Sequence, residues 1–366
     1  MGRFQLSTMY TPRRRRVGCD LSRSFEIAGR PVGPEYPPLV LAEVGINHEG
    51  SLDKAIQMVD DAVDAGCECL KFQTHVIEDE MIPNEVIPGN ASESIWDIMS
   101  RCALSEADDE RLKEYVEKKG AIFLSTPFSR AAAVRLQKMG VAAYKIGSGE
   151  CNNYPLVEHI AQYGKPVIVS TGMNDIDTVR PSVEILRKHG VPFGLLHCTS
   201  MYPTPYDKVR LGAMQELGAA FPDAVVGLSD HTTTIYACLG AAALGASILE
   251  RHFTSSRDWP GPDVPISMTP PELHDLIEGS KAIHQCLGGS KEILSEEQPT
   301  IDFAYASVVA ILDVAEGETI TESNIWVKRP GTGEILAKDF RSLLGRRATR
   351  AIVKNEQLKW SDVGDD

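Results

Sequence analysis

Side chains that could carry out catalysis follow nearly every apolar, strand-like run in the first four-fifths of the sequence. They are Glu43, Lys71, Gln73, Thr126, Ser148, Glu150, Ser170, His197, Ser229, His231 and His252. Imidazoles suit a divalent transition-metal ion, and an ammonium group with several hydroxyls suits a phosphate. A carboxylate in a partly dry pocket can transfer protons. If these groups share one pocket, we expect the chain to be an enzyme.

Eight apolar runs, each followed by a helix-like segment, must position these side chains. The runs cover residues 38–44, 67–72, 121–125, 142–146, 165–170, 192–198, 224–229 and 247–252. This alternation predicts an α/β fold, a (β/α)8 TIM barrel over residues 36–287. The carboxyl ends of the strands in such a barrel open into one mouth. Residues two hundred positions apart can therefore share one site.

Two histidines stand at the ends of the last two predicted strands, His231 in GLSDHT and His252 in LERHFT. These strands are neighbours in a closed barrel, so both imidazoles can face one metal ion. Two nitrogens and open positions would make that ion a Lewis acid for a carbonyl group. The alternative is a structural, hydrogen-bonded histidine at each position. Their location at adjacent strand ends favours the metal site.

A phosphate site is predicted from one ammonium group and several hydroxyls around the same rim. The residues are Lys71, Thr126, Ser148, Ser170 and Ser229. A single serine at a strand end is usually a turn residue, but five such groups at one rim favour phosphate binding. The sequence has no Walker motif and no GxGxxG, which argues against a nucleotide cofactor.

Three carboxylates are candidates for proton transfer or for contacts to sugar hydroxyls: Glu43, Glu150 and Asp263. Glu43 interrupts an apolar strand, which is costly unless the charge is satisfied or functional. Asp263 lies in the loop GPDV, where a plain surface role is an open alternative. Ser200 and Tyr202, in HCTSMYPTP, can contact a polar substrate or simply form a rigid turn.

Composition limits the remaining functions. The chain has 366 residues, 43% hydrophobic and 24% charged, and its net charge of −14 argues against nucleic-acid binding. Its apolar runs are shorter than a membrane span. The eight cysteines form no Cys-x-x-Cys pair, which indicates reduced thiols and a cytoplasmic location.

Four segments follow from the sequence pattern. We expect an N-terminal arm over residues 1–35, with a hairpin near Phe25–Pro31, and then the barrel. Residues 76–105 form an insertion after the second barrel strand, with a helix over 95–102, which can line the mouth. A linker covers 288–302, and a small β-rich domain covers 303–366 with a short helix over 337–344.

Eight motifs in fixed order resemble the sialic acid synthase family, which includes N-acetylneuraminate, legionaminate and pseudaminate synthases. They are AEVGINHEG, LKFQTH, STPF, KIGSGE, STGM, HCTSMYPTP, GLSDHT and LERHFT. The resemblance extends over residues 36–366. EGETITESNIWVKRPGTG near the C-terminus matches the antifreeze-like SAF domain of that family.

The resemblance implies a condensation of phosphoenolpyruvate with an open-chain N-acyl hexosamine and water. The acceptor would be N-acetylmannosamine or a diacetamido 6-deoxy relative, and the products a nonulosonic acid and phosphate, by C–O cleavage. It implies Mn²⁺, with Mg²⁺ or Co²⁺ possible, on His231 and His252. It also implies a domain-swapped homodimer in which Arg329 of KRPGTG reaches the N-acyl group, although a surface arginine is normally unremarkable.

Carried onto this chain, the family's remaining roles fall on the residues already singled out. Phosphoenolpyruvate would be held by Lys71, Thr126, Ser148, Ser170 and Ser229, and the sugar by Glu43, Gln73, Ser200, Tyr202, Asp263 and Arg329. Glu43, Lys71 and Glu150 would be the catalytic residues, with Glu150 assisting proton transfer.

Two departures from the family pattern bear on the sugar. Val264 replaces a common histidine in GPDH, and Ser200 replaces a common asparagine. We expect both near the sugar site. Two alternative functions are a metal-dependent aldolase that uses pyruvate, which would need no phosphate site, and a non-catalytic carbohydrate-binding barrel, which would have lost site residues. None of His231, His252, Lys71 and Glu150 is lost.

Overall fold

The structure is a computed structural model that describes residues 23–364. The chain divides into two compact units, the first ending at Gly288 and the second beginning at Gly289. Of the N-terminal arm expected over residues 1–35, residues 1–22 lie outside the described residues.

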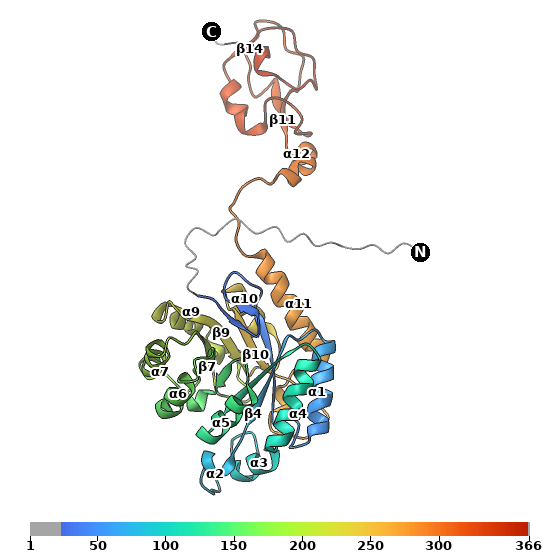
Figure 1. The fold of residues 1–366 in the computed structure, drawn as a ribbon. Coiled ribbons are helices and arrows are strands. Elements are labelled where there is room, and N and C mark those ends of the chain that lie inside the picture. The colour runs from blue at the N-terminus through green and yellow to red at the C-terminus, as the bar shows by residue number, and fades with distance from the viewer. Residues whose placement is uncertain (1–22, 365–366) are drawn as a thin grey trace. The chain divides into compact units, whose positions relative to one another are not determined.

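The first unit is a barrel of eight parallel strands surrounded by helices (Figure 1). The strands are β3 (Leu39–Gly45), β4 (Cys69–Thr74), β5 (Ile122–Pro127), β6 (Tyr144–Ile146), β7 (Val167–Ser170), β8 (Phe193–Cys198), β9 (Val225–Asp230) and β10 (Ile248–His252). Their order in the sheet is β5-β4-β3-β10-β9-β8-β7-β6, so each strand pairs with a neighbour in sequence and β3 pairs with β10. Among the described residues β5 and β6 touch without a hydrogen-bonded ladder, so the barrel is nearly closed. The predicted fold is confirmed.

The helices pack around the strands through one apolar face each. The longer ones are α1 (Leu52–Asp64), α4 (Glu106–Lys118), α5 (Arg130–Met139), α6 (Tyr154–Ala161), α7 (Ile176–Lys188), α9 (Leu211–Ala220), α10 (Tyr236–Ala243) and α11 (Pro270–Cys286). In α1 the Ser51 side chain caps the first turn, and Ala55, Met58 and Val59 are buried at helical spacing. Gly66 then takes a φ of +90°, which favours glycine and ends the helix.

A buried ion pair joins two of these helices. Arg135 of α5 donates to Asp109 of α4 over 2.8 Å, and Asp109 is 3% exposed. Burial raises the pKa of Asp109 to about 6, although Arg135 opposes the shift.

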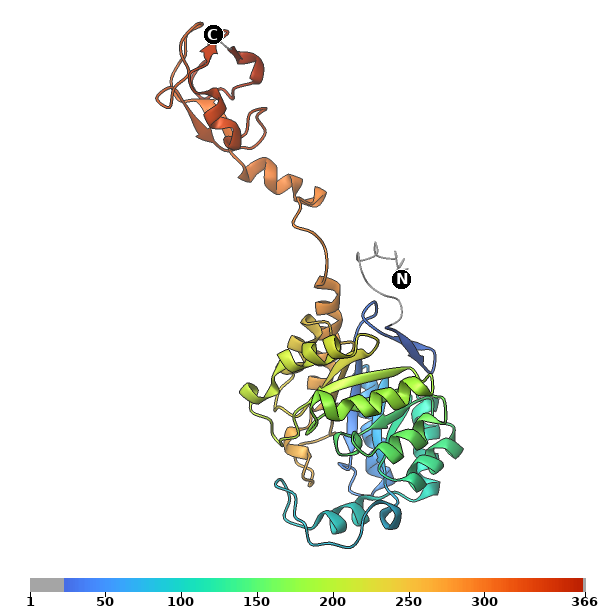
Figure 2. The same cartoon turned by 90° about the vertical axis from the view of Figure 1, so that its left-hand side faces the viewer.

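A hairpin of β1 (Phe25–Ile27) and β2 (Arg30–Val32) closes the amino end of the barrel. Phe25, Ile27 and Val32 join one apolar cluster with barrel residues such as Leu41 and Leu124. The hairpin near residues 25–31 is confirmed. Figures 1 and 2 show it at the end of the barrel opposite to α2 (Ile77–Glu80) and α3 (Ile95–Cys102).

The segment from 76 to 105 carries α2 and α3 between β4 and α4. The Ser94 side chain accepts a hydrogen bond from the Asp97 backbone N–H and caps α3. Ile98 and Cys102 pack with Ile46, which follows β3. The predicted helix over 95–102 is confirmed, and it lies at the end of the barrel where the strands finish.

The second unit has its own apolar core, which includes Val308, Ile320, Ile325 and Ile335. Its elements are η3 (Ser295–Glu297), α12 (Gln298–Ala304), β11 (Ser307–Ala310), β12 (Ile325–Lys328), η4 (Ala337–Leu343), β13 (Arg347–Ala348), η5 (Trp360–Asp362) and β14 (Val363–Gly364). The helix predicted over 337–344 is a 3₁₀ helix. Within residues 23–364, no helix combines the length and the apolar character needed to cross a membrane.

Candidate active site

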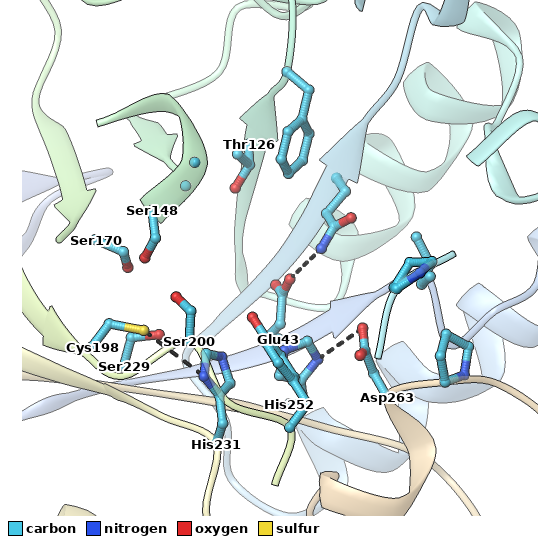
Figure 3. A pocket seen from close by; sticks show the side chains of 18 of the residues that line it. Glu43, Thr126, Ser148, Ser170, Cys198, Ser200, Ser229, His231, His252 and Asp263 are labelled. Carbon is cyan, nitrogen blue, oxygen red and sulfur yellow. Dashed lines mark hydrogen bonds and ion pairs between the residues drawn. The ribbon is translucent and has the colours of Figure 1, made fainter. Parts of the chain in front are cut away.

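One cavity of about 360 Å³ opens at the carboxyl ends of the barrel strands (Figure 3). Most of the predicted site residues line it: Glu43, Lys71, Gln73, Thr126, Ser148, Ser170, Ser200, Tyr202, Ser229, His231, His252 and Asp263. In Figure 3, Ser148, Ser170 and Ser200 gather on one side and Asp263 lies on the other. Glu43 and His252 lie between them.

The hydroxyl side of the cavity contains a buried ammonium group, as predicted. Lys71 is 4% exposed, donates to the Thr126 hydroxyl over 3.0 Å and lies 2.9 Å from the Glu43 carboxylate. Gly172 lets the chain pass close to the serines, since a Cβ there would lie 2.4 Å from Ser200 Oγ and 2.8 Å from Ser148 Oγ. Ser200 Oγ is buried without a hydrogen-bond partner, which leaves it available to a ligand.

Two charged residues in this region, Lys145 and Glu250, were not predicted. Lys145, on β6, donates to the Ser170 hydroxyl over 2.7 Å, and its Nζ lies 3.5 Å from Glu250 Oε1. Glu250, on β10, accepts a hydrogen bond from Ser229 over 2.8 Å. Both residues line the cavity. The signal was present in the sequence, because each charge interrupts an apolar strand as Glu43 does.

Burial disfavours the charged form of every ionisable group in this cluster, so desolvation acts to lower lysine pKa values and to raise carboxyl pKa values. Desolvation lowers the pKa of Lys145 and raises the pKa values of Glu43 and Asp263. Desolvation is also the largest effect on Lys71 and opposes its charge, but Glu43, Glu250 and Asp263 together outweigh it, and the pKa of Lys71 is raised. With Glu250 included, three carboxyl groups face two ammonium groups in one cavity.

The two predicted metal ligands lie side by side. The rings of His231 and His252 have their centroids 5.4 Å apart, and Tyr202 packs against His231 at 4.2 Å. His231 Nδ1 lies 3.1 Å from the Thr199 carbonyl oxygen, which leaves Nε2 for a ligand. His252 Nδ1 is buried without a hydrogen-bond partner and is 3.7 Å from Asp263 Oδ2.

This donor set fits an open metal site. Burial and the neighbouring His231 lower the pKa of His252 well below its usual value, so that ring is the neutral form that binds metals. Burial opposes the charge of His231, but the Cys198 sulfur 3.8 Å from its Nδ1 raises the pKa to about 9, so protons and metal ions compete for this ring. Across residues 23–364 no three His, Cys, Asp or Glu side chains form a closed metal site. The protein would supply two nitrogens and leave the other positions open.

A chain of polar contacts leads from the cavity toward the next loop. Gln73 donates to Glu43 Oε1 over 2.9 Å, and its own Oε1 lies 3.1 Å from His75 Nε2. His75 Nδ1 lies 2.7 Å from Glu80 Oε2, and the ring stacks on Phe128. His75 is thus placed to hold the amide of Gln73 in one orientation.

The side of the cavity beyond Asp263 is formed by the 76–105 segment. Asn90 donates to Asp263 Oδ1 over 3.2 Å, and it too was not predicted. The remaining residues that the segment contributes to the cavity are apolar: Pro88, Ala91, Ile95, Ile98 and Met99. Val264 directly follows the cavity residue Asp263 but does not line the cavity itself. Its side chain is buried beside Gly261, 2% exposed.

Three residues singled out in the sequence, Glu150, Arg329 and His197, are not among those that line this cavity. Glu150 follows Ser148 in η1 (Ser148–Glu150), lines a neighbouring cavity and accepts a hydrogen bond from Asn153 over 2.5 Å. Arg329 belongs to the second unit. His197 is buried at the end of β8, where its Nε2 lies 2.7 Å from the Val209 carbonyl oxygen, and that contact gives it a structural role.

Comparison with known proteins supports one family. Residues 58–292 match the NeuB family, and residues 305–364 match the SAF domain. The N,N'-diacetyllegionaminic acid synthase of Campylobacter jejuni is 34% identical over 331 residues, 88% of this chain and 98% of that protein. The human N-acetylneuraminate-9-phosphate synthase is 31% identical over 90% of this chain and 94% of its own length. A crystal structure of the Leptospira borgpetersenii N-acetylneuraminic acid synthetase has a TM-score of 0.70 and 32% identity, over 76% of this chain and 95% of that one.

Proposed function

Since this chain belongs to the NeuB family and is an enzyme of the sialic acid synthase type, we propose that it condenses phosphoenolpyruvate with an open-chain N-acyl hexosamine. Water adds, phosphate leaves by C–O cleavage, and the product is a nonulosonic acid. N-acetylmannosamine and its diacetamido 6-deoxy relatives are the acceptors to test.

One observation carries this proposal: a phosphate-binding side and a pair of imidazoles share one cavity. Lys71 and Lys145 bring two ammonium groups to the serines and Thr126, which suits a phosphate ester. His231 and His252 lie beside them. Orienting two substrates in one mouth supplies much of the rate of such a condensation.

We propose that His231 and His252 hold Mn²⁺, with Mg²⁺ or Co²⁺ as alternatives. A divalent ion would polarise the acceptor's aldehyde as a Lewis acid. The carboxyl groups of Glu43, Glu250 and Asp263 line the same cavity and favour a bound cation there. The open coordination positions leave room for the aldehyde oxygen.

The remaining steps are assigned to residues of the cavity. The methylene carbon of phosphoenolpyruvate bonds to the aldehyde carbon, and the aldehyde oxygen takes up a proton and becomes a hydroxyl group. Water adds at the enol carbon and loses one proton; the C–O bond to phosphate then breaks, the second proton leaves with phosphate, and a keto group remains. Lys71, Lys145 and the hydroxyls stabilise the departing phosphate. Glu43 is assigned the role of carrying a proton, since burial raises its pKa and its carboxyl group lies 2.9 Å from Lys71 Nζ. Glu150, which lies outside the cavity, is assigned no step.

A domain-swapped homodimer, in which Arg329 contacts the acyl group of the acceptor bound by a second copy, is part of this proposal. Its support is the SAF match over residues 305–364. Replacing Arg329 with alanine should raise the acceptor KM and leave the phosphoenolpyruvate KM unchanged. A loss of stability with unchanged KM values would make Arg329 a structural residue.

The test is phosphate release from phosphoenolpyruvate with Mn²⁺ and a panel of N-acyl hexosamines. Release that requires an acceptor and stops with a chelator would establish the reaction. An aldolase would instead consume pyruvate with the same acceptors and release no phosphate. Binding of acceptor without turnover of either donor would identify a non-catalytic carbohydrate-binding barrel.

A further inference from the structure

The cavity has two chemically different sides. The ammonium groups, hydroxyls and imidazoles come from strand ends, whereas the far side comes from the 76–105 segment and Ile46. We call this far side the apolar wall, and its residues are Ile46, Pro88, Ala91, Ile95, Ile98 and Met99. Asn90, bonded to Asp263, is the polar group that the segment adds beside it. The end of an acceptor that extends past Asp263 therefore meets aliphatic groups.

The apolar wall has no cation of its own. The basic residues that line the cavity within the described chain are Lys71, Lys145, His231 and His252, all on barrel strands or directly after one. Arg101, also in the segment, lies on an adjoining cavity, where it pairs with Glu49 and, at 3.3 Å, with Glu93. No arginine lines the active-site cavity in residues 23–364.

The N-terminus of α3, the positive end of its helix dipole, already has a carboxylate beside it. Ser94 donates to the Asp97 carboxylate over 2.7 Å, and the Asp97 backbone N–H donates back to Ser94 Oγ. A carboxylate in the first turn is the group that a helix N-terminus stabilises. Asp97 thus supplies a negative charge at the N-terminus of α3, which would otherwise attract a phosphate.

We propose, resting on the function proposed above, that the apolar wall selects an unphosphorylated acceptor with alkyl or acyl groups at its far end. A 6-deoxy hexosamine with two acetamido groups has this character, because a methyl group replaces the 6-hydroxyl. A 6-phosphate group would have to move out of water and lie against aliphatic side chains with no positive charge beside it. The loss of its hydration carries a large free-energy penalty. Discrimination between methyl and hydroxymethyl is smaller, of the order of tenfold.

The experiment compares kcat/KM for three acceptors under the same Mn²⁺ and phosphoenolpyruvate concentrations. These are N-acetylmannosamine, its 6-phosphate, and 2,4-diacetamido-2,4,6-trideoxymannose. We expect the 6-phosphate to be used at least about 100-fold less well than N-acetylmannosamine. We expect the diacetamido sugar to be used about tenfold better.

The outcomes separate this inference from the proposed function. Equal or better use of the 6-phosphate overturns the inference and upholds the condensation. Preference for N-acetylmannosamine over the 6-deoxy sugar overturns the inference too. No phosphate release with any acceptor overturns both.

A pair of variants tests the wall itself. Ile95→Gln puts an amide on the wall, and Ile87→Gln makes the same change at a residue of the segment that is 58% exposed and does not line the cavity. Ile95→Gln should reduce the preference for the 6-deoxy sugar about tenfold without changing the phosphoenolpyruvate KM. Ile87→Gln should leave that preference unchanged. Met99→Gln serves as a second wall variant if Ile95→Gln lowers the thermal stability, and an unchanged preference in the folded wall variant would overturn the proposal.

Discussion

Lys145 on β6 and Glu250 on β10, strands that are not neighbours in the sheet, bring Nζ and Oε1 to within 3.5 Å in the barrel interior. Both are nearly inaccessible to solvent, at 1% and 5% exposure. Each also holds a hydroxyl of the proposed phosphate-binding side, Ser170 and Ser229 respectively. The pair thus fixes two hydroxyls and balances its own charge.

Removing one partner of this pair should destabilise the barrel more than removing both. Glu250→Gln leaves the buried Lys145 ammonium without its carboxylate, and we expect it to lower the free energy of unfolding by about 3 kcal/mol. Adding Lys145→Met removes the orphaned charge, so the double variant should lose at least about 1 kcal/mol less than the sum of the single losses. Urea unfolding of the four proteins measures this. Additive losses would show that the two charges are not coupled.

Replacing His252 with alanine should lower turnover by at least about 1000-fold with little loss of stability, because the ring is a proposed ligand of the catalytic metal ion. The measurement is phosphate release with Mn²⁺, together with Mn²⁺ binding by calorimetry. His274→Ala, at an exposed position of α11, is the matched control. Wild-type turnover of the His252 variant without metal would remove the metal from the proposal.

The contact between His75 and Gln73 predicts a selective effect on the acceptor. His75→Phe keeps a ring that stacks on Phe128 but loses the contacts to Gln73 and Glu80. We expect the acceptor KM to rise about tenfold, the scale of one lost hydrogen bond to a polar group, with the phosphoenolpyruvate KM unchanged. Steady-state kinetics with each substrate varied in turn would show this. Equal changes in both KM values would indicate a general structural defect.

Asp109 should make the stability of the barrel depend on pH. Its pKa is about 6 in the folded protein against a usual 3.8, so between these values the folded state holds a proton that the unfolded state has lost. The stability from this group is present below pH 4 and is lost as pH rises to about 6. Asp109→Asn cannot titrate, so its stability relative to wild type should increase by about 2 kcal/mol from pH 4 to pH 7. Unfolding at both pH values tests this, and a constant difference would mean that Arg135 fully compensates the buried charge.

The fold and most of the cavity were predictable, because strand periodicity and the barrel rule together place strand ends in one mouth. Lys145 and Glu250 were missed although the cost of a buried charge, applied to Glu43, applies equally to them. Glu150 was misplaced since the turn of η1 sends Ser148 toward the cavity and Glu150 toward its neighbour. That turn depends on the backbone after β6, which residue patterns do not reveal.

The apolar wall could not have been predicted from periodicity. The helix over 95–102 was recognised, but the direction of its Ile95 and Met99 side chains depends on how the segment returns to the barrel. Its contact with Ile46, which follows β3, involves residues about fifty positions apart. Only the folded chain shows that these residues share a cavity with His252 and Asp263.

Apart from Ile46, the wall is carried by one continuous stretch between β4 and α4, whereas the groups assigned to the chemistry are distributed over the strands of the whole barrel. If the wall selects the acceptor as proposed, substitutions within residues 76–105 can change the preferred acceptor without changing the groups assigned to the chemistry. Exchange of residues 76–105 between relatives with different acceptors would then transfer the acceptor preference together with this one segment.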